Sequence, residues 1–201
     1  VLSDSYQVVR PRYYTLADSY FYTMPEGYSI LQHIDEKTQW DMFLFVPNER
    51  AARDAMNLYI RNQHITVVYY NAGTYEGFGC MRRYMESHNL SMPVSQNVVV
   101  AGVYIAICMQ YPTIELYGVE HSWTRNLSVN EDNEVCLENP HFYDSKGQKV
   151  QTQMGWNLHV TLNKYARMFE SYWELNALAE KRKVRIINKT KDSFIDAFPK
   201  K

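Results

Sequence analysis

An uninterrupted apolar run near the middle of the chain most constrains the fold. Residues 98–109, VVVAGVYIAICM, carry no charged side chain. Because a membrane-spanning helix needs roughly 20 apolar residues, the run is too short to cross a bilayer. We therefore expect a core helix over 97–110 that is apolar on nearly every face, covered by a sheet on one side and by a neighbouring helix on another.

Strand patterns and helix patterns alternate along the rest of the chain. Alternation with short links predicts parallel βαβ units with right-handed crossovers. The expected fold class is α/β, a Rossmann-like doubly wound and mainly parallel sheet. The expected strands are 12–17, 42–47, 64–70, 113–119 and 184–190, and the expected helices are 28–39, 49–60 after an Asn48 cap, 76–87, 97–110 and 158–181.

Length, charge and cysteine content limit the class of protein. A chain of 201 residues fits a single Rossmann-like domain over 1–201, and the missing initiator Met before Val1 indicates an N-terminally truncated domain. With 21 basic and 22 acidic residues, the chain lacks the excess of positive charge expected of a protein that binds nucleic acid by charge alone, and no nucleic-acid partner is expected. Three cysteines without metal-ligand spacing, and no signal peptide, favour a reduced protein in the cytoplasm.

A polar segment follows the expected strand 113–119. Periodicity is lost over 120–155, apart from a hairpin around 134–138, and loops of this length are usually functional or disordered. Aromatic anchors such as Trp123 and Trp156 favour a lid-like or insertion loop over a disordered one.

Two histidines in this segment are candidate general bases. Ligands of α/β sheets bind at the carboxyl ends of the strands, and His121 lies just beyond one of them. His141 lies in the sequence HFYD, where Asp144 is near enough to orient its ring. With an ordinary pKa near 6.5, either ring can accept a proton from a hydroxyl group. The alternative is that one of them caps the strand end or packs against Trp123.

Motifs of several enzyme classes are missing from the sequence. Asp-x-Asp is absent, and its nearest approximation, Asp132-Asn133-Glu134, is read as a solvated turn. Glycine-rich phosphate loops, Gly-x-Ser-x-Gly and zinc spacing are also absent, which disfavours dehydrogenases, P-loop enzymes and α/β-hydrolases. Without a metal, protein donors would stabilise a departing phosphate, and the candidates are Tyr104, Arg125 and Tyr143.

Two longer stretches carry a family resemblance. The run AGVYIAICMQYPTIELYGVEHSW resembles bacterial surface-polysaccharide glycosyltransferases related to sialyltransferases, in which an SGVYM helix precedes a G-Y-K-x-I-Y-L-x-G-I/V-D strand. The run also resembles hydroxymethylpterin diphosphokinase-like proteins. The end, KVRIINKTKDSFIDAF, is similar to the closing I-x-N-x-T-x-x-S-x-I-D-A-F of polysaccharide-cluster members.

The resemblance implies metal-independent sugar transfer from a nucleotide donor, with a histidine base and tyrosines that assist phosphate departure. This chain departs from the family in three ways. The Gly-Asn-Gly-Pro-Ser-Leu loop that holds the nucleotide is absent, and we place it upstream of Val1; Ala101 replaces the serine of SGVYM; and Glu120 replaces an aspartate.

Residues and resemblance together give a set of expected site residues. We expect His141, His121 and Tyr143 to be catalytic, Asn71, Ala101, Gly102, Tyr104 and Gly118 to bind the nucleotide, and Ser122, Trp123 and Arg125 to bind the substrate. Gly102 is explained equally well by ligand contact and by tight helix-to-strand packing, because a helix-interior glycine costs about 1 kcal/mol relative to alanine.

The expected function is a cytoplasmic glycosyltransferase of surface-polysaccharide synthesis, which takes a sialic-acid-like sugar from a nucleotide donor to a hydroxyl of a glycan acceptor. Neither a metal nor a cofactor is expected. Association with the inner face of the membrane and homo-oligomerisation are compatible with the sequence. The alternatives are a non-catalytic module that binds a nucleotide or glycan, and a pterin diphosphokinase-like enzyme, which would need Mg²⁺ and clustered carboxylates.

Overall fold

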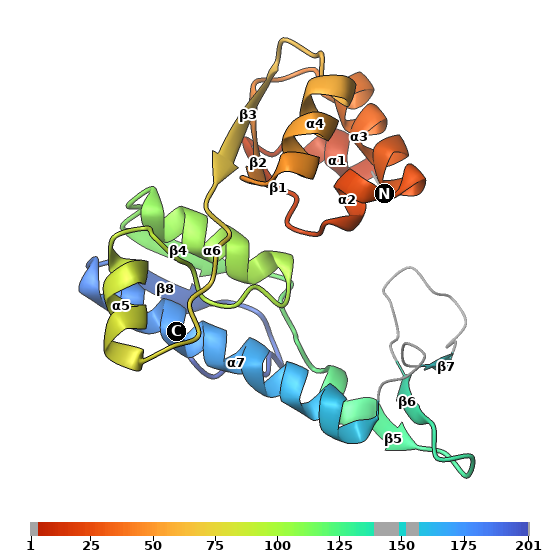
Figure 1. Ribbon diagram of the computed structural model, residues 1–201, viewed down its shortest axis with the longest axis vertical. Helices are drawn as coiled ribbons and strands as arrows, with labels where there is room; N and C mark the ends of the chain where they lie inside the picture. Colours follow the sequence, from red (N-terminus) through yellow and green to blue (C-terminus); the bar gives the residue numbers. More distant parts are fainter. Residues whose placement is uncertain (1–3, 139–148, 152–156, 201) are drawn as a thin grey trace. The chain divides into compact units, whose positions relative to one another are not determined.

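The computed structural model describes residues 4–138, 149–151 and 157–200 of the chain (Figure 1). Its contacts divide the chain into two compact units, Val1–Met109 and Gln110–Lys201. Helices and strands are mixed, and both units contain parallel strand pairs. The α/β class is thus confirmed, whereas the doubly wound sheet stays a prediction because the described strands form separate small sheets.

The first unit alternates helices and strands. Its elements are α1 (Asp4–Val9), β1 (Tyr13–Thr15), α2 (Tyr20–Thr23), α3 (Pro25–Lys37), β2 (Met42–Pro47), α4 (Arg50–Tyr59), β3 (Ile65–Tyr70), α5 (Gly79–Ser87) and α6 (Val98–Cys108). The strands form a parallel sheet in the order β1-β2-β3, so β2 is central. The chain crosses the sheet in one direction, from β1 to β2 and then from β2 to β3. Because connections between parallel strands are right-handed, α3 and α4 lie over the same face of the sheet.

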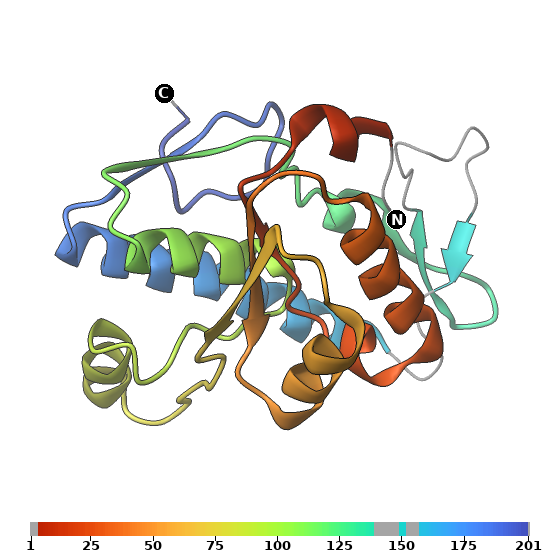
Figure 2. The same cartoon turned by 90° about the horizontal axis from the view of Figure 1, so that it is seen from above.

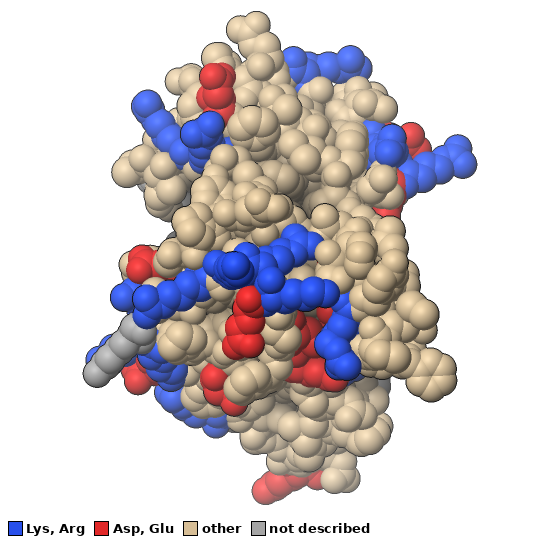
Figure 3. Space-filling model, turned by 90° about the vertical axis from the view of Figure 1, so that its left-hand side faces the viewer, with Lys and Arg blue, Asp and Glu red and all other residues tan. Residues whose placement is uncertain are grey.

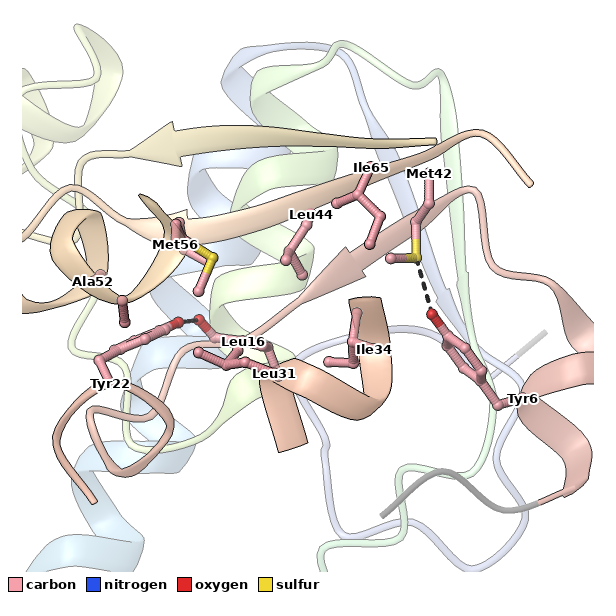
Figure 4. Close-up of a cluster of buried hydrophobic side chains, with 12 residues drawn as sticks. Tyr6, Leu16, Tyr22, Leu31, Ile34, Met42, Leu44, Ala52, Met56 and Ile65 are labelled. Carbon is pink, nitrogen blue, oxygen red and sulfur yellow. Dashed lines mark hydrogen bonds between the residues drawn. The ribbon is translucent and has the colours of Figure 1, made fainter. Parts of the chain in front are cut away.

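Alternate residues of β2 build the core on that face. Met42, Leu44 and Val46 are at most 1% exposed and pack with Leu31 and Ile34 of α3. Figure 4 shows Met42 and Leu44 with Leu31 and Ile34. The Tyr6 hydroxyl donates to Met42 Sδ over 3.5 Å. A continuous apolar strand is what burial on both faces requires, and β2 has the bounds that its sequence predicts.

Helix α6 corresponds to the core helix expected over 97–110. Six of its residues are buried, and the side chain of Asn97 caps its N-terminus by accepting from the backbone N–H groups of Val99 and Val100. Phe45, on the other face of β2 from Leu44, borders the same hollow as Tyr104 and Ile105 of α6. The prediction of a short buried helix is confirmed.

The second unit contains two small sheets and the longest described helix. Strand β4 (Thr113–Leu116) pairs in parallel with β8 (Arg185–Asn188), and α7 (Leu158–Lys181) precedes β8. Between β4 and α7 lie η1 (Trp123–Asn126) and the antiparallel strands β5 (Leu127–Val129), β6 (Val135–Glu138) and β7 (Lys149–Gln151). Figure 2 shows the same elements in a second view.

The boundaries agree with the sequence in some places and differ in others. Helix α7 has its predicted bounds. The predicted cap at Asn48 is wrong, because Glu49 is the N-cap of α4 and Asn48 Oδ1 accepts from Arg53 Nε instead. Within the predicted lid over 120–155, the described residues form η1 and strands β5 to β7, and Asp132-Asn133-Glu134 lies in the exposed turn between β5 and β6.

The surface carries charges of both signs, and the described helices are short or polar. On the face that Figure 3 draws, basic and acidic side chains lie beside each other, in line with the net charge of −1. Of the helices in the described ranges, none combines the length and apolar character that a membrane span requires.

Candidate functional site

A cleft lies at the carboxyl ends of the three parallel strands of the first unit. Its volume of about 740 Å³ lies within the range of roughly 300–1,000 Å³ that ligand pockets have. Its lining is Tyr14, Thr15, Leu16, Ala17, Asp18, Ser19, Phe21, Tyr22, Pro47, Glu49, Tyr70, Ala72, Thr74, Val94, Ser95, Gln96, Asn97 and Val98. Each strand therefore contributes its last residues or the loop that follows it.

Two carboxylates enter the cleft from neighbouring strand ends. Asp18 follows β1, where its Oδ1 accepts from the backbone N–H of Tyr20 over 2.9 Å. Glu49 follows β2 as the N-cap of α4, and its side chain makes no capping hydrogen bond. Both residues are exposed, so water and a ligand can reach them.

Two tyrosines that line the cleft have raised pKa values. Burial, together with Glu49, raises the pKa of Tyr70 to about 12. Burial, followed by the charges of Tyr70, Glu49 and Asp18, raises the pKa of Tyr22 further, and its hydroxyl donates to the backbone oxygen of Leu16. Both phenols are therefore uncharged at neutral pH and act as hydrogen-bonding groups rather than as bases.

The N-terminus of α6 forms another wall. Ser95, Gln96, Asn97 and Val98 line the cleft there. The Ser95 hydroxyl donates to the backbone oxygen of Asn97 over 2.9 Å, and Asn97 Oδ1 accepts from Val99 N and Val100 N over 2.9 and 3.1 Å. The helix dipole gives this wall a partial positive charge, which favours an anionic group nearby.

The predicted nucleotide-binding residues of the first unit lie beside this cleft rather than in its lining. Asn71 and Tyr104 border a smaller hollow of about 220 Å³, which shares Tyr70 with the cleft. Asn71 Nδ2 donates to the backbone oxygen of Leu90 over 3.0 Å, and the Tyr104 hydroxyl donates to that of Ser91. Both side chains thus hold the segment between α5 and α6.

Two further predicted residues lie inside α6. Ala101 is fully buried. A Cβ atom built on Gly102 meets no heavy atom within 4 Å, so the described structure does not require glycine there for close packing. Of the two explanations for Gly102, ligand contact stays a prediction.

His121 lies in a packed environment in the second unit. It is 7% exposed, its Nε2 lies 2.5 Å from the Tyr172 hydroxyl, and its ring stacks on Trp123 at a centroid distance of 4.4 Å. Burial lowers the pKa of His121 to about 4, so the ring is uncharged at neutral pH and is a weak base. Its φ of 51° places the backbone in the left-handed region. The packing alternative describes this geometry, and the catalytic role stays a prediction.

The predicted substrate-binding residues directly follow His121 in the sequence. Ser122 is the N-cap of η1, and the Trp123 ring also stacks on Tyr165 at 6.1 Å. The Arg125 guanidinium lies 5.0 Å from the centre of the Phe194 ring. Gly118, predicted to bind nucleotide, has a φ of 69° in the turn after β4, a conformation that favours glycine. His141 and Tyr143 lie outside the described residues.

A buried hydrogen-bond network holds the loop after β4. Asn188 Nδ2 donates to Ser193 Oγ, which donates to the backbone oxygen of Val119 over 2.7 Å. Thr190 Oγ1 accepts from Val119 N and donates to the backbone oxygen of Leu116. The three polar side chains of the network are the Asn, Thr and Ser of the closing motif that carried the resemblance, so that part of the motif is structural in this chain.

The cleft residues Asp18, Ser19 and Glu49 were missed by the sequence reading. The signal in the sequence is the polar residue directly after each expected strand, because ligands of parallel sheets bind at the carboxyl ends of the strands. In the described part of the chain, no three His, Cys, Asp or Glu side chains lie close enough together to hold a metal ion.

No protein-family model matches the chain, and comparisons with curated proteins and with solved structures gave no match either.

Proposed function

We propose that the chain binds the nucleotide part of an activated sugar in the strand-end cleft and acts as a glycosyltransferase. One observation carries the proposal: a cleft of about 740 Å³ lies where the three parallel strands end and where α6 begins. Parallel α/β sheets bind ligands at this position as a rule.

The walls of the cleft suit the parts of a nucleotide. Aromatic and apolar side chains, among them Tyr14, Phe21, Val94 and Val98, offer surfaces for a flat base. The start of α6 offers its dipole to a phosphate, while the N–H groups of Val99 and Val100 are held by the Asn97 side chain. The carboxylates and hydroxyls between them offer partners for sugar hydroxyls.

The catalytic step in this proposal is a direct displacement. A histidine accepts the proton of the acceptor hydroxyl, the oxygen attacks the anomeric carbon, and the bond to the phosphate oxygen breaks, leaving the electron pair with the nucleotide. We assign the base to His141 and assistance to the leaving phosphate to Tyr143, because a ring with a pKa of about 4, such as His121, is a weak base at neutral pH. The acceptor is a glycan, and we place the reaction in the cytoplasm.

A panel of nucleotide sugars tests this function. Transfer to a glycan acceptor, or hydrolysis of the donor, is measured by chromatography for the wild-type chain, for His141→Ala and for the control His33→Ala. His33 is an exposed residue of α3. We expect turnover with at least one donor, loss of turnover with little loss of donor binding in His141→Ala, and normal turnover in His33→Ala. Absence of both binding and turnover for every donor would refute the proposal.

A non-catalytic binding module is the second candidate. The observation that favours it is the packed position of His121, whose Nε2 is engaged by Tyr172. In that case a nucleotide or glycan binds the cleft, no donor is consumed, and His141→Ala changes neither binding nor turnover.

A further inference from the structure

The described lining of the cleft has an unusual charge for a site that receives a phosphorylated ligand. It includes two carboxylates, Asp18 and Glu49, and none of its residues is a Lys, Arg or His. A carboxylate accepts hydrogen bonds and repels phosphate, whereas hydroxyl groups donate to it. The two carboxylates are therefore suited to a different part of the ligand from the start of α6.

The two carboxylates influence the tyrosines that line the cleft. Glu49 and Asp18 both contribute to the raised pKa of Tyr22, and Glu49 also contributes to that of Tyr70. Both charges thus act on one phenol, that of Tyr22. Asp18 Oδ1 is oriented by its bond to the backbone N–H of Tyr20, which fixes the carboxylate at the strand end.

Building on the proposed function, we propose that Asp18 and Glu49 form a hydroxyl-recognition subsite, in which their carboxylates accept hydrogen bonds from neighbouring hydroxyls of the ligand. The anionic group of the same ligand lies at the first turn of α6, away from the carboxylates. Neighbouring hydroxyls occur in the ribose of a nucleotide and in a monosaccharide, and the test below separates these two sources.

Calorimetric titration of the full chain provides the test. The probes are the four ribonucleoside monophosphates, their 2′-deoxy counterparts, and the neutral monosaccharides glucose, galactose and N-acetylglucosamine. The proteins are the wild-type chain, Asp18→Asn, Glu49→Gln and the control Glu36→Gln, an exposed carboxylate of α3 outside the cleft. Equal thermal unfolding midpoints establish that the exposed substitutions leave the fold intact.

We expect affinity to fall about tenfold in Glu49→Gln and in Asp18→Asn, because hydrogen bonds to charged groups contribute about that much, and to stay unchanged in Glu36→Gln. A ribose in the subsite gives a preference for ribonucleotides over deoxynucleotides that shrinks in both cleft variants. A monosaccharide in the subsite gives equal binding of the two nucleotide series and loss of monosaccharide binding in the same variants.

Other results overturn the subsite. Tighter nucleotide binding in Glu49→Gln would mean that phosphate lies against the carboxylate, and unchanged binding of every probe in both cleft variants would mean that the carboxylates do not touch the ligand. If either result is found and nucleotides bind the wild-type chain, the proposal of a hydroxyl-recognition subsite is wrong and the proposed function still stands. If no nucleotide and no monosaccharide binds the wild-type chain, both fail.

Discussion

His121 shows how burial changes the chemistry of a single residue. Its ring lies between Trp123 and Tyr172, and the loss of water around it lowers its pKa to about 4. The folded protein therefore holds an uncharged imidazole at a pH where the unfolded chain, with an ordinary pKa near 6.5, begins to take up protons. That difference makes the stability of the fold depend on pH.

Stability is expected to decrease as the pH falls through the range from 6.5 to 4. Between these values the unfolded chain binds more protons than the folded one, so protonation favours unfolding. His121 alone should lower the free energy of unfolding by about 2 to 3 kcal/mol between pH 7.5 and pH 4.5. Urea denaturation of the wild-type chain and of His121→Gln at both pH values measures this contribution.

The exposed ring of His33 provides the matched control. In His121→Gln the free energy of unfolding should decrease less between pH 7.5 and pH 4.5 than it does in the wild-type chain. The control His33→Gln should behave as the wild-type chain does. The same pH dependence in all three proteins would contradict a buried, uncharged His121.

The residue scale is also where the sequence was least informative. A histidine just after a strand has the same sequence signature whether it faces a ligand or packs in a core, and only the contacts with Trp123 and Tyr172 separate the two. Glu49 shows the converse, because its position after β2 was visible in the sequence but its place in the cleft depends on how β1, β3 and α6 surround it.

At the scale of elements, two helices begin with the same type of cap. Asn97 caps α6 and Asn157 caps α7, each through its side-chain oxygen. Only Asn97 lines the cleft. Substitutions at the two caps therefore separate the effect of a cap on helix stability from its effect on ligand binding.

Replacing either cap by alanine should lower the free energy of unfolding by about 1 kcal/mol. Asn97→Ala should also weaken nucleotide binding, because the first turn of α6 loses the side-chain oxygen that holds the N–H groups of Val99 and Val100 in place. Asn157→Ala should leave nucleotide binding unchanged. Chemical denaturation and calorimetry measure the two effects. Equal binding by both variants would argue that the start of α6 is not part of the site.

Gly102 allows a second prediction about α6. Because a Cβ atom meets no neighbour within 4 Å, Gly102→Ala should raise the free energy of unfolding by about 0.5 to 1 kcal/mol. Ala106→Gly in the same helix is the matched control and should lower it by a similar amount. A destabilised Gly102→Ala variant would instead support tight helix packing, while a stabilised variant with weaker nucleotide binding would support ligand contact.

Elements with strong patterns were predictable and short ones were not. The continuous apolar run of β2 and the long periodic helix α7 have their predicted bounds, because their patterns extend over their full lengths. Helices α1 and α2 were missed, since helices of six and four residues present too few turns for a periodic pattern. Pairing of β5 with β6 depends on the turn at Asn130, whose side-chain oxygen accepts from Asp132 N and Glu134 N.

At the scale of the whole molecule, the sequence established the class of fold and located one group of ligand candidates in the second unit. The structure adds a cleft in the first unit, at the edge where β1, β2 and β3 end together. Sequence alone could not define that cleft, because its volume arises from segments that are up to about eighty residues apart in the chain, from Tyr14 to Val98.

The central claim is that this cleft receives the ligand, and backbone amide NMR of the full chain during titration with ribonucleotides tests it most directly. The account predicts shifted resonances in 15–19, 48–49, 70–74 and 94–98, all of which belong to the cleft or its rim. Shifts confined to the described residues of the second unit, or no shifts at millimolar nucleotide, would contradict it.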